Sequence, residues 1–105
     1  MNLQSRVNNP AIPEADKSWL LKIIRNFLPD VHVLAFGSRV HGHHKRYSDL
    51  DIALKGDRPI EQRFLGYIQE HCDQSNIPYK IDIMDYQHLS LEFKEIIDRN
   101  AIELV

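Results

Sequence analysis

The sequence predicts a small α/β (α+β) fold in which helices pack on one face of a mixed β-sheet. Two patterns predict this class. Some segments carry apolar residues at helical spacing, and the segments between them are short runs, either wholly apolar or alternating between apolar and polar residues, that are typical of strands. The chain has 105 residues, of which 43% are hydrophobic and 27% are charged, a balance found in globular domains rather than in disordered segments. We therefore expect a single domain over residues 13–105, preceded by a flexible lead-in over residues 1–12.

Three main helices are expected. The first covers residues 13–28, because apolar side chains recur from Leu20 at i, i+3, i+4, i+7 and i+8, and Pro29 then ends the pattern. The second covers about residues 60–74, where a similar apolar stripe follows a Gly-Asp-Arg-Pro turn. The third begins near Ser90, whose hydroxyl is suited to capping the first turn.

The strands are expected between these helices. Residues 31–36 read V-H-V-L-A-F, which is typical of a strand covered on both faces. Residues 48–54 and 79–85 alternate between apolar and polar side chains, as half-buried strands do. Residues 101–105 are expected to form a short edge strand. A short helical turn is expected between the first two strands, after Gly37.

Composition and charge exclude several classes of protein. The net charge of −2 provides no global field that would attract nucleic acid or an anionic membrane. No apolar run approaches the roughly 18–20 residues of a membrane span, and the opening MNLQSRVNNPAIP lacks the apolar core of a signal peptide. Cys72 is the single cysteine, which excludes an internal disulfide, and its place on a helical stripe predicts a core thiol. We expect a soluble, cytoplasmic protein.

Three aspartates form the first candidate for chemistry. Asp49 and Asp51 fall on one face of their strand, with Cα atoms about 6.6–6.8 Å apart, and Asp82 has the matching parity in the strand over residues 79–85. If the two strands pair, all three carboxylates come together. Carboxylates held this close repel one another, and a divalent cation relieves the repulsion. The cluster suits two Mg²⁺ ions roughly 3.5–4 Å apart, an arrangement that serves displacement at phosphorus.

The Gly37-Ser38-Arg39 step is the complementary candidate. A glycine directly after a buried strand allows close approach of the backbone to a ligand, and the amides that open the next turn point toward an anion. Ser38 adds a hydroxyl donor, and Arg39 has the planar guanidinium that pairs with phosphate oxygens in a bidentate way. The segment therefore predicts a site for a polyphosphate tail.

Each motif also has an ordinary structural explanation. Gly-Ser occurs in many turns, and Asp-Leu-Asp can be the polar face of any surface strand. His41, His43 and His44 lie in the basic segment between the two motifs and could suggest zinc, but no cysteine or carboxylate stands nearby at ligand spacing, so a solvated loop is the preferred interpretation. The joint order of the motifs, with ten residues between Ser38 and Asp49, is more specific than any part.

In this combination the chain resembles the minimal nucleotidyltransferase (MNT) antitoxins of the DNA polymerase β-like nucleotidyltransferase superfamily. The resemblance rests on F36-G37-S38, on D49-L50-D51-I52 and on a later strand that carries Asp82, and it extends from about residue 14 to the C-terminus. It implies a fold like the polymerase β palm and an enzyme that moves AMP from ATP to an acceptor hydroxyl. Many members of the family are antitoxins that adenylylate a HEPN-domain ribonuclease toxin.

The resemblance also implies residue roles. Asp49, Asp51 and Asp82 would be catalytic and would bind Mg²⁺, while Gly37, Ser38 and, by the chemistry above, Arg39 would bind the nucleotide. One position departs from the family, which often has a second arginine where His41 stands. Since histidine is mostly neutral at pH 7 and has a shorter reach, a weaker grip on phosphate is expected.

Two other functions stay open from the sequence. The chain could be a binding antitoxin that occludes its toxin and keeps a vestigial nucleotide site. It could also modify a small molecule such as an aminoglycoside, although the second domain that holds acceptors in larger nucleotidyltransferases is missing.

Overall fold

The computed structural model describes residues 12–40 and 48–105 of the chain. The elements in chain order are α2 (Glu14–Phe27), β1 (His32–Phe36), β2 (Leu50–Lys55), α3 (Gln62–Asp73), β3 (Ile81–Asp85), the 3₁₀ turn η1 (Tyr86–His88), α4 (Leu91–Asn100) and β4 (Ile102–Glu103). Every main helix and strand expected from the sequence is present, with ends that differ by at most a few residues. The short helical turn expected after Gly37 lies partly outside the described residues, and the described part, residues 37–40, is a turn.

The four strands form one mixed sheet in the order β3-β2-β1-β4. β1 runs antiparallel to both β2 and β4, whereas β2 and β3 are parallel and are joined through α3. The two-residue β4 lies at one edge, as expected for the C-terminal segment. The predicted mixed sheet is confirmed.

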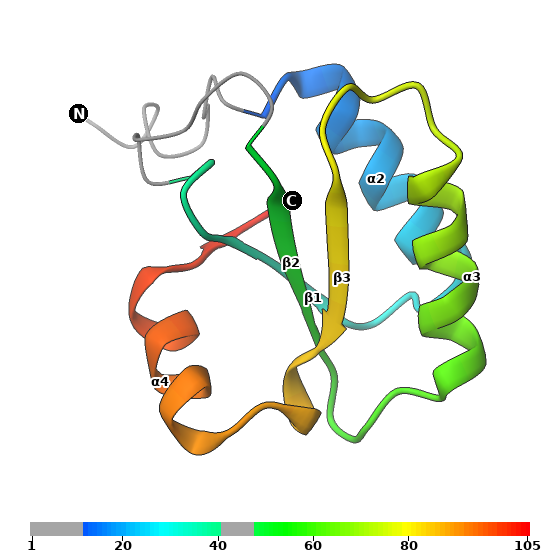
Figure 1. Ribbon diagram of the computed structural model, residues 1–105. Coiled ribbons are helices and arrows are strands. Elements are labelled where there is room, and N and C mark those ends of the chain that lie inside the picture. Colours follow the sequence, from blue (N-terminus) through cyan, green and yellow to red (C-terminus); the bar gives the residue numbers. More distant parts are fainter. Residues whose placement is uncertain (1–11, 41–47) are drawn as a thin grey trace.

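Helices cover both faces of this sheet (Figure 1). α2 and α3 lie together on one face, where Leu20, Ile24 and Ile68 pack with the apolar side chains of the strands, such as Ile52. The expected one-sided arrangement holds for these two helices. α4 packs against the opposite face, because the alternate strand positions there are also apolar: the fully buried Ala53 and its neighbours need a cover of their own.

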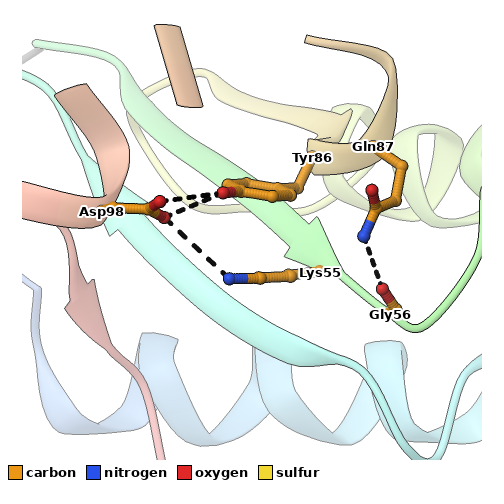
Figure 2. A network of polar contacts seen from close by, with 5 residues as sticks. All are labelled: Lys55, Gly56, Tyr86, Gln87 and Asp98. Atoms are coloured by element: carbon orange, nitrogen blue, oxygen red, sulfur yellow. Dashed lines mark hydrogen bonds and ion pairs between the residues drawn. The ribbon is translucent and has the colours of Figure 1, made fainter. Parts of the chain in front are cut away.

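Polar contacts at the end of β2 connect η1 and α4 to the sheet (Figure 2). The Tyr86 hydroxyl donates to both carboxylate oxygens of Asp98 in α4, at 2.9 and 3.0 Å. Lys55 at the end of β2 lies with its Nζ 3.9 Å from the same carboxylate. The side-chain amide of Gln87 donates to the Gly56 carbonyl at 2.7 Å. These contacts hold η1 and α4 against the sheet.

Further local expectations agree with the structure. The Ser90 hydroxyl accepts from the amide of Phe93 at 3.1 Å, so it caps α4 as expected. Cys72 is buried in the core, and burial, with a smaller contribution from Asp73, raises the pKa of its thiol to about 11. Of the predicted lead-in, residues 1–11 lie outside the described residues, and Ile12 is buried in the core. Within the described residues no helix is long and apolar enough to cross a membrane.

The free edge of β3 is covered by a side chain rather than by a strand. Gln69 of α3 donates its amide to the Ile81 carbonyl at 2.7 Å, and its carbonyl oxygen accepts from the Ile83 amide at 2.9 Å. The primary amide thus makes the two hydrogen bonds that a neighbouring strand would make to an outward-facing pair of backbone groups.

Replacing Gln69 with Leu is expected to lower the free energy of unfolding by about 1–3 kcal/mol, because two backbone groups lose their partner. Urea denaturation followed by circular dichroism measures the change. Gln62, an exposed glutamine at the start of the same helix, provides the matched control: Gln62→Leu should stay within about 0.5 kcal/mol of the unaltered protein. Equal effects of the two changes would contradict the role given to Gln69.

Candidate active site

The register of two parallel strands places two of the three predicted aspartates side by side. Asp51 of β2 is the direct partner of Asp82 of β3. Asp49 immediately precedes β2, two residues before Asp51, and is exposed, whereas the other two side chains are half-buried. The expected pairing of the strands is therefore confirmed. The catalytic and metal-binding roles of Asp49, Asp51 and Asp82 stay predictions.

The electrostatics of this pair follow from its position. The pKa of the Asp51 carboxyl is raised, first by burial and then by the negative charges of Asp82 and Asp49. Lys80 lies beside the cluster, with its Nζ 3.4 Å from Oδ1 of Asp82. A cation placed between Asp51 and Asp82 would relieve the repulsion, and carboxylate oxygens are the ligands that Mg²⁺ prefers. The donor set fits a hard divalent cation.

The described residues do not hold a complete ligand set in place. Among residues 12–40 and 48–105, no three His, Cys, Asp or Glu side chains already gather around one possible metal position. Asp51 and Asp82 are fixed by the sheet, while Asp49 stands at its border. The three predicted histidines, His41, His43 and His44, lie outside the described residues.

Gly37 lies where the Gly37-Ser38 motif comes close to the Asp49-Leu50-Asp51 motif. β1 ends at Phe36, the partner of Asp51 in the antiparallel pairing, so the turn that follows lies beside this carboxylate. Gly37 has a φ of +93°, and a Cβ atom at this position would stand 2.6 Å from Oδ2 of Asp51. Residues with a side chain rarely adopt this conformation, and glycine also leaves room for the carboxylate. The close neighbour of this backbone in the structure is Asp51, and the predicted approach to a phosphate ligand stays a prediction.

The turn over residues 37–40 is closed by a hydrogen bond from the Val40 amide to the Gly37 carbonyl, at 3.1 Å. Ser38 is exposed within it. The backbone that would face phosphate thus stands directly beside the paired carboxylates. The two motifs of the sequence are therefore adjacent in the fold, while their binding of phosphate and metal stays a prediction.

Arg39 makes contacts that the sequence did not predict. Its side chain is buried, its Nε donates to the Ser48 carbonyl at 2.8 Å, and its guanidinium carbon lies 3.7 Å from the centre of the Tyr79 ring. The role of Arg39 as a phosphate ligand stays a prediction. Tyr79 lies two residues before β3, and nothing local in the sequence connects positions 39 and 79.

A cavity of about 540 Å³ lies elsewhere, and its lining residues are Asp16, Trp19, His71, Gln74, Ser75, Asn76, Ile77 and Pro78. None of the three aspartates lines it. The candidate site lies instead where the turn after β1 meets the starts of β2 and β3.

The fold and these motifs agree with the comparison to known families. Residues 21–105 match the family model described as "Polymerase beta, Nucleotidyltransferase". The chain belongs to this nucleotidyltransferase family. The family and the fold that the sequence predicted are thereby confirmed, and both of its motifs, Gly37-Ser38 and Asp49-Leu50-Asp51, fall within the matched residues.

One similar protein of this family is named as an adenylyltransferase. A Haemophilus influenzae protein named "Probable protein adenylyltransferase MntA" is 39% identical over 75 residues, which are 71% of this chain and 66% of that protein. The chain thus spans just under two thirds of that relative's length.

Two solved structures share the fold. A toxin–antitoxin crystal structure with AMP-PNP has a TM-score of 0.72 at 20% identity. The match covers 86% of this chain and 73% of the chain in that structure. A crystal structure of a mutant toxin–antitoxin MntA-HpeT has a TM-score of 0.69 at 17% identity. The match covers 85% of this chain and 71% of the chain in that structure. At these identities the two likenesses concern the fold.

Proposed function

We propose that this chain is a Mg²⁺-dependent enzyme that transfers AMP from ATP to a hydroxyl group of a protein. We further propose that the acceptor is a HEPN-domain ribonuclease toxin, which the chain neutralises as a cytoplasmic antitoxin. The observation that carries the proposal is the register of β2 and β3, which sets Asp51 beside Asp82, while the Gly37 turn lies so close to the same Asp51 carboxylate that a Cβ at position 37 would not fit.

The proposed roles follow from this arrangement. Asp49, Asp51 and Asp82 would hold two Mg²⁺ ions, which when bound neutralise charge on the reacting phosphate and favour deprotonation of the acceptor hydroxyl. The amides and hydroxyl of the Gly37-Ser38 turn would bind the β and γ phosphates of ATP. The acceptor oxygen forms a bond to the α-phosphorus, the bond from this phosphorus to pyrophosphate breaks, and the hydroxyl proton is released. Positioning and charge neutralisation supply most of the catalysis.

The names of the similar proteins support the partner and the nucleotide. One relative is named a probable protein adenylyltransferase, and the structural neighbours are toxin–antitoxin complexes, one of them with an ATP analogue.

The proposal is tested by mixing the purified chain with Mg²⁺, ATP and the product of the neighbouring gene. Intact-mass spectrometry should show addition of AMP to that product, and peptide mapping should place it on a hydroxyl side chain. Omitting Mg²⁺ or replacing ATP with a non-hydrolysable α,β analogue provides the control. Absence of any mass gain at every ratio of the two proteins would overturn the proposal.

A second candidate is a binding antitoxin with a vestigial site. The observations that favour it are the ion pair of Lys80 with Asp82 and the incomplete ligand set among the described residues. In this case an Asp51→Asn variant would protect cells from the toxin as well as the unaltered protein does. Loss of protection in that variant, at equal expression, would favour the enzyme.

A further inference from the structure

A buried cation–π stack lies under the candidate site. The guanidinium carbon of Arg39 is 3.7 Å from the centre of the Tyr79 ring, and only 4% of Arg39 and 8% of Tyr79 is exposed. A buried guanidinium requires partners for its charge and its donors. Here the aromatic face and the Ser48 carbonyl supply two of them, the latter at 2.8 Å from Nε. The stack is part of the folded interior and not a surface contact.

The partners belong to the three segments that form the candidate site. Arg39 lies in the same turn as Gly37 and Ser38, Ser48 directly precedes Asp49, and Tyr79 stands three residues before Asp82. One side chain therefore connects the phosphate-binding turn with the starts of both strands that carry the aspartates. We call this set, Arg39 with Ser48 and Tyr79, the clasp.

Two more hydrogen bonds hold the Tyr79 segment of the clasp in place. The Leu50 amide donates to the Lys80 carbonyl at 2.8 Å, which joins the starts of β2 and β3 next to the stack. The Tyr79 hydroxyl donates to Oδ2 of Asp16 in α2 at 2.7 Å. Burial, with help from this carboxylate, raises the pKa of the Tyr79 phenol, so it stays protonated and keeps donating. The ring is thereby held in place from the helix side.

From this geometry we infer that Arg39 is a positioning residue of the nucleotide site, which acts through the clasp and not by direct contact with phosphate. The inference rests on the proposed function, and it replaces the phosphate contact expected from the sequence. The clasp sets the distance between the Gly37-Ser38 turn and the carboxylates. A displacement of about 1 Å between such groups can slow a reaction about 100-fold.

Four variants separate positioning from phosphate binding. Arg39→Ala and Tyr79→Leu each remove the stack from one side, Arg39→Lys keeps the charge without the planar group, and Tyr79→Phe keeps the ring without its hydroxyl. If Arg39 positions the site, the first three should slow AMP transfer by about 10- to 100-fold. The double variant should be no slower than either single one, because both act on one contact. Tyr79→Phe keeps the ring on the guanidinium and loses only the hydrogen bond to Asp16, so it should slow transfer by only about 3-fold, less than Tyr79→Leu.

If Arg39 instead bound phosphate directly, the variants would give a different set of results. Arg39→Ala would raise the KM for ATP, Arg39→Lys would recover part of the loss, and Tyr79→Leu would leave both the rate and the KM unchanged. This set of results would overturn the inference.

Amide hydrogen exchange provides a readout that does not require activity. In Arg39→Ala and Tyr79→Leu the Leu50 amide should exchange about 10-fold faster or more, because the strand starts open locally. Arg25→Ala is the matched control, since Arg25 also donates from its guanidinium to a backbone carbonyl, that of Val31, at 2.7 Å at the other end of β1. At an equal loss of Tm, this control should leave the Leu50 amide unchanged.

The two readouts distinguish failure of the inference from failure of the proposed function. Faster exchange at Leu50 in a chain that transfers no AMP would support the clasp and reject the enzyme. Unchanged exchange in both clasp variants would overturn the clasp, whatever the activity of the unaltered protein.

Discussion

Asp51→Asn is expected to lower AMP transfer by about 10³-fold or more while the fold is retained. The change removes the central carboxylate of the site, which is the strand partner of Asp82 and lies beside the Gly37 turn, but it keeps the size of the side chain. A loss of this order is typical when a principal electrostatic group of an active site is removed. Transfer is measured by intact mass against time, and retention of the fold by circular dichroism.

The same change is expected to raise the stability of the protein. Burial and two neighbouring carboxylates raise the pKa of Asp51 in the folded state, so folding favours its protonated form. Its contribution to stability is fully present below the unfolded-state pKa and is lost as the pH rises through the folded-state pKa. At pH 7 the unaltered protein therefore carries a repulsion that the Asn variant lacks.

The Tm of Asp51→Asn should thus exceed that of the unaltered protein at pH 7, and the difference should shrink as the pH is lowered through the folded-state pKa of Asp51. Thermal denaturation across a pH series measures this. Asp57→Asn, at an exposed turn position, is the control and should show neither effect. A lower Tm at pH 7 together with full activity would contradict both the role and the electrostatic account of Asp51.

Gly37→Ala is expected to lower the free energy of unfolding by about 1–3 kcal/mol, because alanine is strained at a φ of +93°. The added Cβ would also stand 2.6 Å from Oδ2 of Asp51, so the turn or the carboxylate must move. AMP transfer should then fall by about 100-fold, the effect expected from displacing reacting groups by about 1 Å. Urea denaturation and the transfer assay measure the two effects.

Gly66→Ala is the matched control for this prediction. Gly66 lies within α3, and a Cβ atom there would meet nothing within 4 Å. Alanine should therefore stabilise the helix by about 0.5–1 kcal/mol and leave transfer unchanged. If Gly37→Ala behaved like Gly66→Ala, the close approach of the turn to Asp51 would have no functional meaning.

The local elements could be predicted from the sequence because their signals lie between near neighbours. The apolar spacing from Leu20 defines α2, and the Ser90 hydroxyl reaches an amide only three residues away to begin α4. The alternation around Asp51 and Asp82 placed both side chains on the polar positions of their strands. Two short motifs in a fixed order were then specific enough to identify the family.

Other features depend on residues far apart in the chain. Asp85 looks like an ordinary polar end of a strand, yet it is buried and accepts hydrogen bonds from the Ile60 amide at 2.8 Å and the Gln87 amide at 3.0 Å. The stack of Arg39 on Tyr79 joins residues forty positions apart. Neither contact leaves a periodic signal, because each involves a single side chain and a distant partner.

The sequence by itself determined the types and order of the elements, the parity of the aspartates and the family. Only the tertiary structure decided that β2 and β3 pair in the register that sets Asp51 opposite Asp82, that α4 covers the second face of the sheet, and that Arg39 is buried beneath the site. The physical reason is that periodicity reports which side of an element is apolar. The register between strands and the partner of a buried charge are set by the packing of the whole domain.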